Sequence, residues 1–153
     1  MKYFAYGSNL NLLDLSDWCK RKKEKPPQLQ NPEVAILENY RLDFTKYSPT
    51  RDGGVADIVY STNDIVYGVV FDVSEDDVYI LDKKEGHDYF YKRCRIKVKL
   101  LNEEIFDDVI TYEVVDKEDF ISPTRDYIDI IINGATDFGL PENWINKLKS
   151  FKK

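Results

Sequence analysis

The middle of this chain consists mostly of β-prone runs, and helices do not regularly separate one run from the next. Strand-like runs are expected at 3–6, 34–44, 55–60, 64–73, 91–101 and 108–115. Helices are expected at 10–19, 75–85, 123–135 and 141–148. A parallel sheet needs a helix after almost every strand, so this order favours an α+β fold, with a mixed β-sheet curled into a small barrel and flanking helices.

The 153 residues are predicted to form one domain, 1–153, because no long Pro-, Gly- or Ser-rich stretch divides them. Hydrophobic residues make up 42% of the chain, which is enough apolar surface for a core and argues against disorder. The chain is therefore expected to fold alone.

The formal charge of −6 argues against nucleic acid or a membrane surface as a partner. The basic run Lys20-Arg21-Lys22-Lys23, followed by Lys25, is the one cationic cluster of the sequence, and it is interpreted as a solvated helix end. Contact with an anionic polymer or lipid through this run is the alternative that it leaves open.

The two cysteines, Cys19 and Cys94, are too few to indicate a disulfide framework or a zinc site. The first residues are too poor in apolar side chains for a signal peptide, and about 18 consecutive apolar residues occur nowhere. These features predict a cytoplasmic protein with reduced thiols.

The opening sequence YFAYGSNL places a glycine, a hydroxyl and an amide between a strand and a helix. Backbone N–H groups at such a turn lack partners within the helix, and the helix dipole adds to their attraction for an anion. Gly7, Ser8, Asn9 and Leu10 are therefore candidates to bind a carboxylate, the alternative being a plain tight turn.

Glu85 is the carboxylate with a positional reason to be singled out. Ser74 and Asp77 resemble a capping box, and Gly86 stands where a helix C-terminal glycine belongs, so Glu85 ends the helix. The helix dipole makes a negative charge unfavourable there, and burial in a cavity would make it more unfavourable still. A carboxylate that takes up a proton readily is suited to act as a general base. Lys83 and Lys84 permit the alternative of a simple surface ion pair.

Other kinds of site are poorly supported. The chain has no Walker A lysine and no set of spaced glycines, which disfavours nucleotide binding. His87 is its one histidine, so a histidine-based metal site lacks ligands and a nucleophile triad has a single choice of base. Tyr127 is either a core aromatic or a hydrogen-bond donor to a ligand.

The chain resembles the γ-glutamylcyclotransferase family, which includes the AIG2-like proteins. The resemblance rests on five blocks in the family's order. They are YFAYGSNL, GGVADIV at 53–59, VYGVVFDV at 66–73, LDKKEG at 81–86 and SPTRDYIDIIINGATDFGLP at 122–141. The segments 11–30 and 46–52 match no motif of the family, and both are expected to form the rims of the pocket.

The resemblance implies that Glu85 is the catalytic acid and base. It also implies substrate binding by Tyr6, Gly7, Ser8, Asn9, Leu10 and Tyr127. The implied reaction converts a γ-glutamyl amino acid into 5-oxoproline and a free amino acid, without metal or cofactor, in a monomer or homodimer. A γ-glutamylamine or a γ-glutamyl-protected metabolite is the alternative substrate, and a non-catalytic AIG2-like binding module is the alternative class.

Overall fold

Five strands close into a mixed barrel in the order β1-β3-β2-β4-β5, as the computed structural model describes for residues 1–152. The short β1 (Lys2–Ala5) pairs antiparallel with β3 and parallel with β5, where Tyr3 is opposite Ile110. All other neighbouring strands run antiparallel. The predicted α+β class and curled mixed sheet are confirmed.

The two longest strands are β2 (Gln30–Ser48) and β3 (Gly53–Asp72), which form one hairpin. The sequence predicted two strands where β3 is continuous, because residues 61–63 are turn formers. Asn63 adopts a left-handed φ of 69°, and Asn39 opposite has a φ of 64° at a register shift, so the ladder bends without ending. Asparagine tolerates this conformation better than most residues.

Helix α2 (Glu75–Glu85) is confirmed at both ends. Ser74 and Asp77 form a reciprocal capping box, and Gly86 ends the helix with a left-handed φ of 64°. Glycine adopts this conformation without the steric cost of a Cβ atom. The local sequence therefore fixes where Glu85 stands on the helix.

The first helical region differs from the prediction of one helix over 10–19. A 3-10 turn, η1 (Ser8–Leu10), comes first, and α1 (Leu12–Lys22) follows with Asn11 as its N-cap. The Asn11 side chain accepts a hydrogen bond from the Asp14 N–H and donates one to the Ile130 carbonyl. Asn11 thus caps α1 and also binds the backbone of the segment that becomes α3. These two contacts together outweigh the local preference for a helix that begins at Leu10.

The second half of the chain contains β4 (Tyr91–Leu100), β5 (Ile105–Val114), α3 (Arg125–Asp137) and α4 (Glu142–Lys149). The cap of α3 is Thr124, whose hydroxyl accepts from the Tyr127 N–H, so α3 begins two residues later than predicted. Gly134 on this helix lies against the backbone of Leu10 and Asn11. Helix α3 thereby supports the turn that follows β1.

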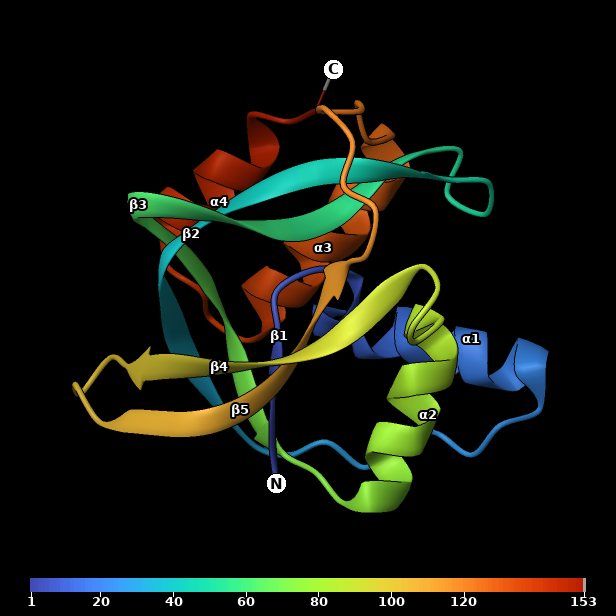
Figure 1. The fold of residues 1–153 in the computed structure, drawn as a ribbon, viewed down its shortest axis with the longest axis horizontal. Coiled ribbons are helices and arrows are strands. Elements are labelled where there is room, and N and C mark those ends of the chain that lie inside the picture. Colours follow the sequence, from blue (N-terminus) through green and yellow to red (C-terminus); the bar gives the residue numbers. More distant parts are fainter. Residues whose placement is uncertain (153) are drawn as a thin grey trace.

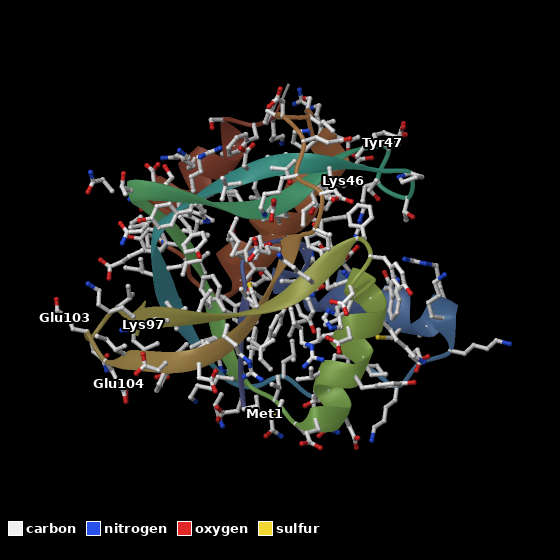
Figure 2. The ribbon with its side chains drawn as sticks, in the orientation of Figure 1. Met1, Lys46, Tyr47, Lys97, Glu103 and Glu104 are labelled. Atoms are coloured by element: carbon white, nitrogen blue, oxygen red, sulfur yellow. The ribbon has the colours of Figure 1, made fainter. Side chains whose placement is uncertain are left out.

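Two pairs of helices cover the barrel (Figure 1). Helices α3 and α4 lie behind the β2–β3 hairpin, where Tyr67 contacts Trp144 and Phe44 contacts Tyr127. Helices α1 and α2 lie side by side, joined by buried contacts among Leu15, Cys19 and Ile80. Figure 2 shows Glu103 and Glu104 pointing outward at the tip of the β4–β5 hairpin, on the opposite side from α1 and α2.

Within residues 1–152, both cysteines are free, and no helix is long and apolar enough to cross a membrane. The basic run Lys20-Arg21-Lys22-Lys23 lies exposed at the end of α1, as interpreted from the sequence.

Gly134→Ala is expected to destabilise the protein, although alanine favours a helix by about 0.8–1.0 kcal/mol. A Cβ at this position would lie 2.4 Å from the Leu10 carbonyl carbon and 2.6 Å from the Asn11 nitrogen. Such overpacking costs about 1–3 kcal/mol and is expected to lower the midpoint of urea unfolding. Asn133→Ala, at the exposed neighbouring position, is the control and is expected to be neutral or slightly stabilising.

Candidate active site

A small cavity opens at the end of the barrel where β1 leads into η1. It has a volume of about 30 Å³, and we call it the inner cavity. Its walls come from β1, η1, β3, α2, β4, β5 and α3. The residues lining it are Tyr3, Tyr6, Gly7, Ser8, Asn9, Ala56, Glu85, Tyr91, Thr111, Tyr112 and Tyr127.

The Glu85 side chain reaches the inner cavity from the C-terminal end of α2 and is partly buried. Its Oε1 accepts a hydrogen bond of 2.8 Å from the Asn9 Nδ2. Among the described residues, neither Lys83 nor Lys84 forms an ion pair with it within 4.0 Å; Lys83 instead pairs with Glu24 at 2.8 Å. The alternative of a surface ion pair is therefore not supported.

Asn9 is 4% exposed and holds Glu85 in place. Its Nδ2 donates to the Tyr3 hydroxyl at 2.9 Å as well as to Glu85, so both amide protons are used. Its Oδ1 is buried and has no hydrogen-bond partner among residues 1–152. A buried acceptor without a partner is costly, so this oxygen is suited to a donor that a ligand supplies.

The turn after β1 has the geometry of an anion site at its first residues only. The Leu10 N–H donates to the Gly7 carbonyl at 3.0 Å, and the Asn11 N–H donates to the Ser8 carbonyl at 2.9 Å. The N–H groups of Ser8 and Asn9 begin the 3-10 turn and have no acceptor inside it. Leu10 does not line the inner cavity, and its side chain belongs to the hydrophobic core.

Tyrosine hydroxyls hold the backbone on the other wall of the inner cavity. The Tyr127 hydroxyl accepts from the Ala56 N–H at 3.0 Å, and the Tyr91 hydroxyl donates to the Ala56 carbonyl at 2.6 Å. The Tyr6 hydroxyl donates to the Tyr112 carbonyl at 2.6 Å. Tyr6 is thus engaged within the protein, whereas Tyr127 receives a hydrogen bond and keeps its own proton to donate.

Burial raises the pKa of Tyr127 to about 12, against the lowering effects of the Ala56 hydrogen bond and of Arg51. The hydroxyl therefore stays protonated at neutral pH and acts as a donor. The Arg51 guanidinium carbon lies 5.3 Å from the centre of the Tyr127 ring, and its two terminal nitrogens bind the Asp14 carboxylate at 3.0 and 2.7 Å.

A second, larger cavity of about 370 Å³ adjoins the first, and we call it the outer cavity. The two share Ser8, Glu85, Tyr91 and Tyr127. The remaining residues that line the outer cavity are Trp18, Arg21, Lys22, Ser48, Pro49, Thr50, Arg51, Val55, Lys83, Lys84, Gly86 and Phe90. It is thus built largely from the segments 11–30 and 46–52, together with the end of α2.

Sequence reasoning missed Tyr3, Tyr91, Tyr112 and Thr111 in the inner cavity, as well as Ala56. The chain contains 11 tyrosines, and nothing in their spacing distinguishes the ones that meet here. The block GGVADIV did carry a signal, because its Ala56 backbone lies between two tyrosine hydroxyls. Within residues 1–152, no group of three or more His, Cys, Asp or Glu side chains could hold a metal ion.

Known proteins resemble this chain in sequence and in fold. The AIG2-like family matches residues 65–148, a range that includes Glu85 and Tyr127. γ-Glutamylcyclotransferase from Bos taurus is 33% identical over 156 residues, covering 98% of this chain and 78% of the bovine protein. The chain belongs to the γ-glutamylcyclotransferase family. The Homo sapiens relative of the same name is 32% identical over 155 residues, with the same coverage of 98% and 78%.

A solved structure named γ-glutamyl cyclotransferase superposes on this member of the family with a TM-score of 0.82. The two are 30% identical, and the match covers 98% of this chain and 86% of the other. Sequence and fold together identify an enzyme of the γ-glutamylcyclotransferase class. The hypothesis of a non-catalytic binding module is not retained.

Tyr127→Phe is expected to lower the free energy of unfolding by about 1–3 kcal/mol, because it removes the acceptor of the buried Ala56 N–H. Urea unfolding measures this loss. Tyr60→Phe is the control: Tyr60 is 65% exposed, and its hydroxyl is expected to contribute almost nothing. Equal stability of the two variants would contradict the role assigned to the Tyr127 hydroxyl.

Proposed function

We propose that this enzyme cleaves γ-glutamyl amides by cyclising the γ-glutamyl group to 5-oxoproline, with Glu85 as the acid and base. The observation that carries the proposal is the Glu85 carboxylate held by Asn9 at the junction of the two cavities, next to the first N–H groups of η1. A base, an anion-binding turn and a chamber for a leaving group thus meet at one point.

The reaction needs a proton transfer in each direction. Glu85 accepts a proton from the substrate's α-ammonium, and the freed nitrogen attacks the γ-carbonyl carbon to form a five-membered ring. The attacking nitrogen loses a second proton as it becomes the ring amide. The original amide C–N bond breaks, Glu85 passes both protons in turn to the departing nitrogen, and the amine leaves as an ammonium ion. The products are 5-oxoproline and a free amine, and no water is consumed.

The turn after β1 is proposed to bind the α-carboxylate of the substrate. In this proposal the N–H groups of Gly7, Ser8 and Asn9 donate to that carboxylate, and the unpartnered Asn9 Oδ1 accepts from the α-ammonium. Binding both charged groups of the α-carbon fixes the position of the attacking nitrogen, which favours its approach to the γ-carbonyl. Such positioning contributes up to about 7–11 kcal/mol in favourable cases.

The γ-carbonyl oxygen gains negative charge as the ring closes. The Tyr127 proton is proposed to stabilise it. Tyr6 contributes through the backbone, since its hydroxyl fixes the Tyr112 carbonyl. Leu10 contributes by burying its side chain, which fixes the turn in the core.

A γ-glutamyl amino acid is the proposed substrate, because the outer cavity beyond Glu85 is rich in cations that suit a carboxylate on the leaving group. A γ-glutamylamine would leave this charge unused.

We also propose a cytoplasmic location, which the two free cysteines support, and a monomer or homodimer without a cofactor.

Glu85→Gln is expected to lower 5-oxoproline release from γ-glutamyl dipeptides by about 10²–10⁴-fold, the usual contribution of a general acid and base. Turnover is measured by chromatography at equal folded concentration, with circular dichroism as the check on folding. Glu75→Gln, at the exposed opposite end of the same helix, is the matched control and is expected to keep full activity.

Undiminished 5-oxoproline release by Glu85→Gln would refute the assigned role of Glu85. Release of free glutamate in place of 5-oxoproline would show hydrolysis, and would refute the cyclisation itself.

A further inference from the structure

The outer cavity is strongly cationic in a protein whose net charge is −6. Arg21, Lys22, Arg51, Lys83 and Lys84 line it, whereas Glu85 is the one carboxylate in its wall. Arg51 is neutralised by Asp14 at 2.7 Å, and Lys83 by Glu24 at 2.8 Å. The five cations exceed the three carboxylates Asp14, Glu24 and Glu85 by two positive charges.

Helix dipoles do not remove this excess. Helices α1 and α2 both end at the outer cavity, at Lys22 and Glu85. Each helix C-terminus carries about half a negative charge, so the two ends together offset about one positive charge. The chamber therefore still attracts an anion after the cations at the helix ends are accounted for.

The unpaired cations lie at two places in the chamber. Lys84 reaches the inner end, where its Nζ lies 3.4 Å from the Ser8 Oγ. Burial lowers the pKa of Lys84, while Glu85 and Asp14 oppose this effect, so an incoming carboxylate would favour its charged form. No carboxylate among the described residues lies within 4.0 Å of this amine.

Arg21 and Lys22 lie at the rim. They share one face of α1 with Trp18, three and four residues before them, and both are exposed. Among residues 1–152, neither has an ion-pair partner within 4.0 Å. Trp18 adds an apolar side chain to the lining of the same cavity.

We propose that the outer cavity selects leaving groups with two negative charges, so that the preferred substrates are γ-glutamyl derivatives of acidic amino acids. In this assignment, which rests on the proposed function, Lys84 binds the α-carboxylate of the leaving amino acid. Arg21 and Lys22 bind its side-chain carboxylate. A volume of about 370 Å³ lies within the range of small-molecule sites and accommodates such a residue.

The test compares γ-glutamyl-glutamate with γ-glutamyl-glutamine, which have nearly the same shape and differ in one charge. The expected kcat/KM is about threefold to tenfold higher for γ-glutamyl-glutamate at low salt, the range of one or two exposed ion pairs. Raising the ionic strength from about 0.01 M to about 1 M shortens the Debye length from about 30 Å to about 3 Å, and is expected to abolish the preference.

The double substitution Arg21→Gln and Lys22→Gln is expected to bring the ratio of the two kcat/KM values close to one. Lys20→Gln, which removes an exposed cation of the same helix outside the cavity lining, is the control and is expected to keep the ratio. A wild-type ratio near one would overturn the proposal, as would a preference that survives the double substitution. No 5-oxoproline from either dipeptide would instead overturn the proposed function, and this inference with it.

Discussion

The four residues of β1 close the barrel, and the site depends on that closure. β1 pairs with β3 on one side and β5 on the other, and its side chains Tyr3, Phe4 and Ala5 are at most 3% exposed. The chain then leaves the barrel directly into η1, whose position Gly134 of α3 fixes. The turn that is proposed to bind an anion is consequently fixed by both the barrel and α3.

Buried polar contacts around this closure join segments that are distant in the sequence. Asn9 binds Glu85, which is 76 residues away, and Tyr127 binds the backbone of Ala56, which is 71 residues away. Asp57 is completely buried and accepts from the N–H groups of Ile58 and Val114, so it joins β3 to β5 behind the inner cavity. Breaking a buried hydrogen bond of this kind costs free energy, which favours a single rigid arrangement of the strands and helices.

In the proposed function, the inner cavity carries the chemistry and the outer cavity selects the leaving group. Eight of the eleven residues that line the inner cavity lie in the sequence blocks on which the family resemblance rests. Of the twelve residues that line the outer cavity alone, seven lie in 11–30 and 46–52. Those segments were expected to form the pocket rims, and the lining of the outer cavity agrees with this.

The sequence by itself determined those helices and strands that are defined by signals within a few residues. The capping box and Gly86 defined α2 and placed Glu85 at its end, and the succession of β-prone runs without regularly spaced helices indicated the mixed barrel. Tertiary structure alone decided that α1 begins at Leu12 with Asn11 as its cap, that β3 continues through Asn63, and that Asn9 contacts Glu85. It also decided which of the 11 tyrosines face the cavity. The reason is physical: capping and turn preferences act within a few residues, whereas buried hydrogen bonds depend on which distant strands the closed barrel brings together.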